Sequence, residues 1–175
     1  MKISKLIQAK TEREYFFLTG HIPLDSKYFI KKIEEGIKKQ TNQSYNTHLI
    51  SKMTSFKYFI GDKEFLKILL PIFDLLDATS FEDTPGWRMT DAWGYKQSFE
   101  EYSKLHHHIP CFLSGAIMLN EHPQALIFPE INETIEAKPG NFVVFSSFLK
   151  HKSNRNVTDK IRYGLSYNLY YEQSF

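Results

Sequence analysis

The chain has 175 residues, a length typical of one domain, and 42% of its residues are hydrophobic. That is enough apolar side chain for a packed core, which excludes a disordered chain. The 22 basic and 20 acidic residues leave a formal charge of +2. This near balance gives no electrostatic reason to expect nucleic acid or a membrane surface as a partner.

Cysteine usage and the apolar segments bear on the compartment. Cys111 is the only cysteine, so no disulfide can form within the chain and no cysteine cluster can bind zinc. The N-terminal stretch lacks the apolar run of a secretory signal. The richest apolar segment, residues 65–76, is interrupted by Lys67, Pro71 and Asp74 and falls short of the roughly 20 residues that span a bilayer. We therefore expect a cytoplasmic protein.

Two amphipathic helices are expected in the first half of the chain. Asp25 and Ser26 are of the types that cap a helix, and apolar residues follow at three- and four-residue steps: Phe29, Ile30, Ile33 and Ile37. Asp62 can cap a second helix with the apolar residues Phe65, Leu66, Leu69, Leu70, Phe73 and Leu76. Pro71 is expected to kink or split this helix, because proline lacks the N–H and clashes with the preceding turn. Both helices are expected to pack against a sheet.

From Trp87 onward the pattern changes to short segments rich in aromatic and β-branched residues. Turn residues separate them, and the predicted strands are 88–95, 112–119, 125–128, 141–145 and 163–171. Helices first and strands afterwards indicate an α+β fold, mainly β, rather than alternating βαβ units. We expect a single domain, in which residues 1–86 supply helical support and the first strands and residues 87–175 form the core.

Three adjacent histidines at 106–108 are the strongest local signal. In an extended strand side chains alternate, so His106 and His108 would share one face and His107 would point away. Two imidazoles on one face can hold one metal ion, although such a pair is more often a surface or hydrogen-bonded feature. A third histidine, His151, follows an apolar strand and could complete a metal set from across a barrel. The other scattered histidines, His21, His48 and His122, are expected at the surface.

A potential anion-binding residue opens the last predicted strand. Arg162 shares one face of this strand with Gly164, Ser166 and Asn168. An arginine inside a barrel is costly unless it is paired. A dicarboxylate ligand would pair it with the bidentate geometry that a guanidinium group suits.

In this order and spacing the motifs resemble the 2-oxoglutarate- and Fe(II)-dependent oxygenases, most of all the small hydroxylase-like proteins of bacteria and phages. The matching stretches lie between Trp93 and Asn168, less than half of the chain: His106-x-His108-Ile-Pro, Pro139-Gly140-Asn followed by Phe145-Ser-Ser-Phe-Leu-x-His151, and Arg162-x-x-x-Ser166-x-Asn168. The pair Trp93 and Tyr102 is similar to that family's lead-in to the metal strand. The resemblance implies a double-stranded β-helix (jelly roll) with N-terminal packing helices and iron at its mouth.

The resemblance also implies roles for individual residues. In most of the superfamily the metal set is two histidines and a carboxylate, but here His108 occupies the position of the carboxylate. We favour a three-histidine set of His106, His108 and His151; a carboxylate from elsewhere or a loss of activity are the alternatives.

The implied cosubstrate site is on the last strand. Arg162 would bind the far carboxylate of 2-oxoglutarate and Ser166 could add a hydroxyl. Many relatives place a serine two residues after the arginine, where this chain has Gly164. A further hydrogen bond could come from the group Tyr102, Tyr95 and Asn168.

The resemblance therefore implies an enzyme, a dioxygenase that uses Fe(II), 2-oxoglutarate and O₂ to hydroxylate a small-molecule or peptide substrate, with succinate and CO₂ as co-products. The sequence identifies neither that substrate nor the oligomeric state. A cupin-type three-histidine dioxygenase is the first alternative. Cupins usually add a glutamate shortly after the histidine pair, where this chain has Cys111, Phe112 and Leu113. A jelly-roll binding module without turnover is the second.

Overall fold

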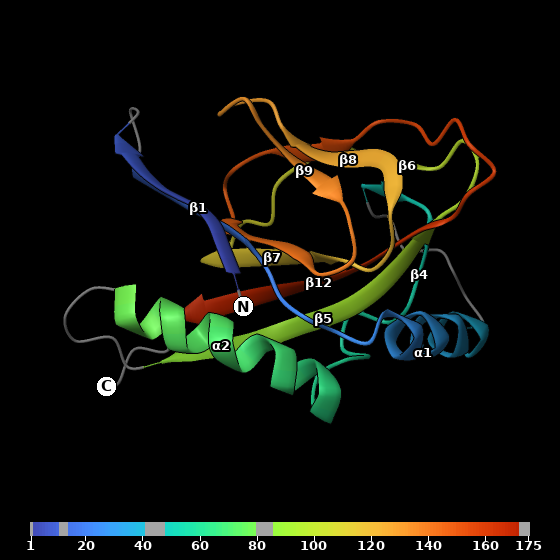
Figure 1. Ribbon diagram of the computed structural model, residues 1–175, viewed down its shortest axis with the longest axis horizontal. Helices are drawn as coiled ribbons and strands as arrows, with labels where there is room; N and C mark the ends of the chain where they lie inside the picture. Colours follow the sequence, from blue (N-terminus) through green and yellow to red (C-terminus); the bar gives the residue numbers. More distant parts are fainter. Residues whose placement is uncertain (1, 11–13, 41–47, 80–85, 172–175) are drawn as a thin grey trace.

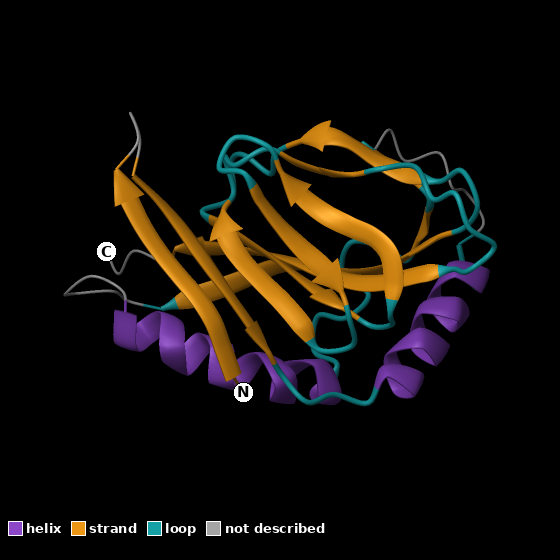
Figure 2. Cartoon of the chain, turned by 45° about the horizontal axis from the view of Figure 1, so that its top comes forward, coloured by secondary structure: helices purple, strands orange, loops and turns teal. Residues whose placement is uncertain are grey.

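The computed structural model describes residues 2–10, 14–40, 48–79 and 86–171. Two antiparallel sheets lie one above the other, and two helices run along the outer side of the larger sheet (Figures 1 and 2). The helices are α1 (Ser26–Lys38) and α2 (Lys63–Thr79). The mainly β, α+β character predicted from the sequence is confirmed. Neither helix is long and apolar enough to cross a membrane, among the residues described.

The larger sheet has seven strands in the order β1-β2-β10-β7-β12-β5-β4. Their bounds are β1 (Lys2–Lys10), β2 (Glu14–His21), β10 (Asn141–Ser146), β7 (Leu113–Met118), β12 (Arg162–Tyr171), β5 (Trp87–Gln97) and β4 (Lys52–Met53). The smaller sheet has the order β3-β6-β11-β8-β9. Its strands are β3 (Leu49–Ile50), β6 (Tyr102–His106), β11 (His151–Ser153), β8 (His122–Phe128) and β9 (Glu133–Ala137). The last eight strands thus pass repeatedly between the sheets, so that residues distant in sequence meet between them.

Strand alternation divides the core into two layers. In β10, Val144 packs toward the helices with Phe29 and Phe65, whereas Val143 and Phe145 pack between the two sheets. Side chains of successive residues point to opposite faces, which is why one strand serves both layers. The inward face of β12 is different, because it carries polar residues in place of apolar ones. The space between the sheets is therefore apolar at one side and polar at the other.

Both predicted helices form, and their predicted caps are confirmed. The Asp25 carboxylate accepts a hydrogen bond from the Tyr28 backbone N–H (3.1 Å), and Asp62 accepts one from the N–H of Phe65 (3.0 Å). Of the two outcomes expected at Pro71, a kink or a split, the split does not occur, because α2 continues through the proline. Two residues expected on the apolar face of α2 lie exposed, namely Leu66 and Leu70. The buried face consists of Phe65, Leu69, Ile72 and Leu76.

The five predicted strands all form, but the description of the first half as helical was incomplete. The β1–β2 hairpin extends the larger sheet, with β2 paired to β10. In β2 the run Phe17-Leu18 is buried on both sides, which obscures the alternation that signals a strand. The remaining unpredicted strands are short: β3, β4, β6, β9 and β11.

Candidate metal centre

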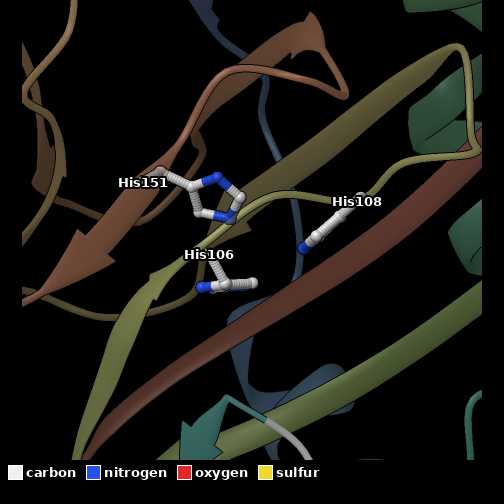
Figure 3. A group of neighbouring side chains, drawn as sticks. All are labelled: His106, His108 and His151. Atoms are coloured by element: carbon white, nitrogen blue, oxygen red, sulfur yellow. The ribbon is translucent and has the colours of Figure 1, made fainter.

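Three imidazoles converge between the sheets, as the sequence predicted. The candidate ligand atoms of His106, His108 and His151 all lie within 4.8 Å of one another. The ring centres of His106 and His151 are 4.3 Å apart, and that of His108 lies 5.1 and 4.9 Å from theirs. Figure 3 shows the three rings facing a common space. No aspartate or glutamate of the described residues joins this cluster.

Strand pairing explains the convergence. Within the pairing of β6 with β11, His106 lies directly opposite His151, so the two imidazoles meet across the ladder. His108 arrives differently from the prediction, because β6 ends at His106 and His108 lies in the following loop. There its backbone N–H donates to the carbonyl of Ser147 (2.8 Å). His107, between the two, is exposed.

Each imidazole is oriented by a hydrogen bond at Nδ1. The Nδ1 of His106 lies 2.7 Å from the Lys104 carbonyl oxygen, and that of His151 lies 3.1 Å from the Leu149 carbonyl oxygen. A carbonyl only accepts, so both Nδ1 atoms carry the proton and both Nε2 atoms keep a lone pair. Such bonds on the outer nitrogen are typical of metal-binding histidines.

The third imidazole is held by side chains. The Nδ1 of His108 lies 2.8 Å from the Asn168 amide oxygen and 3.0 Å from the Ser114 hydroxyl. Ser114 donates to the same amide oxygen (2.8 Å) and lies 2.7 Å from the Ser147 hydroxyl. The Asn168 amide group donates in turn to the Asp91 carboxylate (3.3 Å). This network fixes the ring of His108 and its protonation.

Burial keeps the three imidazoles neutral. Loss of hydration lowers the pKa of His108 to about 4, and the neighbouring His106 adds to this effect. Burial also lowers the pKa of His106 and lowers that of His151 well below its usual range. Neutral imidazoles with oriented lone pairs are the form that binds iron, and also zinc, copper and nickel. The donor set therefore fits a metal ion.

Metal-free protein is expected to lose stability as the pH falls from about 7 to about 4. The unfolded chain takes up a proton on His108 near pH 6.5, whereas the folded chain does so only near pH 4. Between these values the unfolded state binds more protons, which lowers the free energy of unfolding by roughly 3 kcal/mol for this residue alone. Urea unfolding at several pH values measures the slope, and His108→Leu should flatten it. A stability independent of pH in this range would contradict the assignment.

A buried cation lies in the same cavity. Arg162 is 1% exposed, and its Nη1 donates to the Gln97 amide oxygen (2.8 Å) and its Nη2 to the Met118 sulfur (3.3 Å). Its Nε is buried and has no hydrogen-bond partner among the described residues. None of these residues supplies a carboxylate to it. A buried guanidinium without a counter-ion destabilises the folded protein unless a bound anion pairs with it.

Gly164 lies next to this arginine on the inward face of β12, opposite Tyr95 of β5. A Cβ atom on Gly164 would lie 2.4 Å from the Tyr95 hydroxyl oxygen and 2.5 Å from its ring carbon Cζ. The ring of Tyr95 therefore occupies the space that a side chain at this position would take. The guanidinium of Arg162 lies 5.6 Å from the centre of the same ring.

The other residues predicted from the sequence are partly brought together. The face shared by Arg162, Gly164, Ser166 and Asn168 is confirmed by the pairing of β12 with β5. Ser166 and Asn168 line the cavity of about 410 Å³ that contains the histidines and Arg162. Tyr102 is not among its described lining residues; the Arg155 guanidinium lies 5.1 Å from the centre of its ring instead.

Several residues of the site were not predicted. Gln97, Ser114 and Asp91 have polar side chains of common types, and only the pairing of β5, β7 and β12 brings Gln97 and Asp91 to the cavity and Ser114 to His108. His48 is exposed as expected, but it also lines the cavity and stacks on His106, with ring centres 5.5 Å apart. His122 is buried, which corrects the expectation of a surface position.

Comparisons with known proteins place this fold. No protein-family model and no curated protein matches the sequence. Among solved structures, it is similar to a viral collagen prolyl hydroxylase from Paramecium Bursaria Chlorella virus-1 with bound 2-oxoglutarate, at a TM-score of 0.65 and 12% identity over 87% of this chain and 94% of that one. A prolyl-4-hydroxylase of Pseudomonas putida matches with a TM-score of 0.64 and 13% identity, over 90% of this chain and 93% of that one. HygX of Streptomyces hygroscopicus, with bound nickel and 2-oxoglutarate, matches with a TM-score of 0.62 and 10% identity, over 87% of this chain and 81% of that one.

These likenesses define the class by its fold. The chain has the fold of the 2-oxoglutarate- and Fe(II)-dependent oxygenases, in agreement with the resemblance found in the sequence. At 10–13% identity the shared feature is the fold, so the chemistry has to be argued from the site itself.

Proposed function

We propose that the protein is a 2-oxoglutarate- and Fe(II)-dependent dioxygenase that hydroxylates its substrate. One observation carries this proposal: a cluster of three imidazoles lies in the same cavity as a buried arginine that has no acidic partner among the described residues. Three nitrogen ligands leave positions on a metal open for other molecules. The arginine supplies the positive charge that a dicarboxylic cosubstrate needs.

We also propose that the two sheets form a double-stranded β-helix, or jelly roll, within a single domain. The strands β5 to β12 support this, since they form the sheet orders β5-β12-β7-β10 and β6-β11-β8-β9. Residues from both parts of the chain pack into one core, including Phe29 and Phe65 of the helices and Leu165 of β12. Residues 1–86 thus support and extend the larger sheet, and residues 87–175 hold the metal and the cosubstrate.

Each residue has a defined task in this proposal. His106, His108 and His151 would hold the iron, and Arg162, whose Nε has no partner among the described residues, would bind the far carboxylate of 2-oxoglutarate. With O₂, the loaded site supplies the oxidising chemistry that inserts a hydroxyl group and releases succinate and CO₂. The apolar wall around Phe145 limits the access of water to the site.

Tyr95 is proposed as the second donor to this carboxylate. In many oxygenases of this fold a serine two residues after the arginine has that role, and here Gly164 stands at that position. The Tyr95 hydroxyl lies where a side chain on residue 164 would be. Ser166, two residues further on the same face, lines the cavity and could add a hydroxyl.

Gly164→Ser is expected to weaken 2-oxoglutarate binding, although it restores the residue common in relatives. The new Cβ would displace the buried ring of Tyr95, at a cost of about 1–3 kcal/mol in the free energy of unfolding. The double variant Gly164→Ser with Tyr95→Ala should recover binding relative to the single one, because the space is then free, although loss of the buried ring lowers its stability. Calorimetric titration and thermal unfolding measure the two effects. Equal or tighter binding by Gly164→Ser alone would argue against the proposed role of Tyr95.

Anaerobic titration tests the proposed function. Addition of Fe(II) and then 2-oxoglutarate to the purified chain should produce a visible charge-transfer band, which appears only when both bind at one centre. Exposure to O₂ should then release succinate, even slowly and without substrate. Metal binding without the band or succinate would remove the dioxygenase proposal and leave a metal-binding module.

A cupin-type dioxygenase is the second candidate, because in the described part of the chain the cluster consists of three histidines and no carboxylate joins it. Such an enzyme needs no 2-oxoglutarate, so it would give no charge-transfer band with it. The buried Arg162 favours the first candidate. The substrate is a small molecule or a peptide: the similar structures include prolyl hydroxylases and HygX with hygromycin B bound.

A further inference from the structure

The cavity has two chemically different ends along the inward faces of β5 and β12. Arg162 pairs with Gln97 at one end, and Asn168 pairs with Asp91 at the other. Six residues separate the two ends along an extended strand, about 20 Å between backbone positions. His108 contacts Asn168, so the histidine cluster adjoins the end that contains Asp91.

Asp91 is the only carboxylate among the described residues that line this cavity. It is half-buried, and none of the described lysines or arginines forms an ion pair with it. The Thr90 hydroxyl and the Asn168 amide both donate to Oδ2, at 3.1 and 3.3 Å. The other oxygen, Oδ1, accepts no hydrogen bond from another side chain of the described residues. Asp91 thus lies in a cavity whose described lining contains no lysine or arginine at this end.

Aromatic side chains line the same cavity as this carboxylate. Trp93 lies two residues further on the same face of β5, and the ring of Phe56 packs edge-on against it with centres 5.3 Å apart. Tyr170 also lines the cavity. Its pKa is raised by a hydrogen bond with Cys111 and by burial, with the nearby charge of Asp91 adding to both. Aromatic faces attract cations, most strongly those of tryptophan.

We propose that Asp91 and the aromatic wall of Trp93 and Phe56 bind an alkylammonium group of the ligand. The carboxylate supplies the charge-assisted hydrogen bond, and the rings cover the apolar surface of the cation. Because His108 adjoins this end, the bound group lies beside the histidine cluster. The identification of this ligand as the substrate rests on the proposed function. The ammonium site itself depends on the cavity alone.

Matched probes on the full-length chain test this site. Neopentylamine and neopentyl alcohol have nearly the same shape and differ in charge. The amine is expected to bind on the order of tenfold more tightly, as measured by calorimetry and quenching of tryptophan fluorescence. Asp91→Asn should abolish the preference, whereas the exposed control Asp77→Asn should retain it. Trp93→Leu should lower the affinity for the amine. Thermal unfolding checks that this variant remains folded.

A peptide pair identifies the source of the ammonium group. The tripeptide Ac-Gly-Lys-Gly-NH₂ carries the ammonium group on a side chain. Its norleucine analogue has a similar side chain without the charge. Preference for the lysyl peptide assigns a protein substrate, and preference for the free amine alone assigns a small molecule; both support the site if Asp91→Asn abolishes them. Equal binding of charged and neutral probes, no binding of any probe, or a preference that survives Asp91→Asn would overturn the inference.

The same preparation separates this result from the proposed function. A charge-transfer band with Fe(II) and 2-oxoglutarate but no preference for the amine would remove the ammonium site and leave the dioxygenase. A preference for the amine without the band would do the opposite.

Discussion

His151→Ala is expected to abolish iron binding by the protein, whereas His107→Ala leaves it unchanged. His151 is one of three nitrogen donors to the site, and its ring is buried and fixed by the Leu149 carbonyl. Loss of an outer hydrogen-bond partner of a metal ligand already costs roughly 10- to 100-fold in metal affinity. Loss of the ligand itself should exceed that. His107 is exposed and not a member of the cluster.

The metal content after anaerobic loading and dialysis measures this difference directly. His106→Ala should behave as His151→Ala, because the two imidazoles face each other across one strand pair. Thermal unfolding without metal serves as the fold control: removing a buried imidazole that resists protonation should leave the variants folded at neutral pH. If His107→Ala emptied the site and His151→Ala retained the metal, the assignment of the ligands would be wrong.

The sequence predicted which residues meet in the cavity better than it predicted the strands around them. The histidines and Arg162 need partners where they are withdrawn from water, and the family resemblance of their order and spacing implied one shared site. His108 joins the cluster by another route than the predicted strand alternation, because the strand ends at His106 and a loop hydrogen bond to Ser147 places His108. A local pattern cannot foresee such a bond.

Partners of the site residues were harder to predict, because they depend on strand register. Gln97 lies beside Arg162 only because β5 and β12 pair in the observed register. A shift by one residue would bring Lys96 to that position and turn Gln97 outward. His122 is buried for a similar reason: its Nε2 meets the Lys160 carbonyl (3.1 Å), 38 residues away in sequence. Polar residues of common types carry no signal of such distant contacts.

Two features of the first half of the chain differ from the prediction: α2 is not split at Pro71, and strand β2 was not predicted. Pro71 removes one N–H donor from α2, yet the helix continues because its face is held by burial of Leu69 and Ile72. Tertiary packing of this kind outweighs a local penalty of about 3 kcal/mol. In β2 the buried residues are consecutive rather than alternating, since the strand is covered on both faces.

Arg162→Leu is expected to abolish 2-oxoglutarate binding without destabilising the ligand-free protein. The guanidinium has a neutral amide, a thioether and an aromatic ring as its neighbours. Burial of this charge therefore destabilises the folded state, and no ion pair offsets the loss of hydration. Loss of a buried, hydrogen-bonded charge pair with the ligand should weaken binding on the order of 100-fold or more, roughly 3 kcal/mol.

Two variants make this prediction specific. Arg162→Lys keeps the charge but not the two-pronged donor geometry, so it should bind 2-oxoglutarate with intermediate affinity. Arg155→Leu, at an exposed arginine of the neighbouring loop, should leave binding unchanged. Affinity is measured by titrating the iron-loaded protein with 2-oxoglutarate, and stability by urea unfolding of the ligand-free protein.

The two measurements together separate a ligand-binding arginine from a structural one. A structural arginine satisfied by its protein neighbours would reduce stability by several kcal/mol on removal, since its partners would remain buried and unpaired. An arginine kept for a ligand leaves stability unchanged or higher and costs affinity alone. Here the unpartnered Nε and the absence of an acidic neighbour among the described residues favour the second outcome. Lower stability with unchanged affinity would show that Arg162 belongs to the core and that the anion site lies elsewhere.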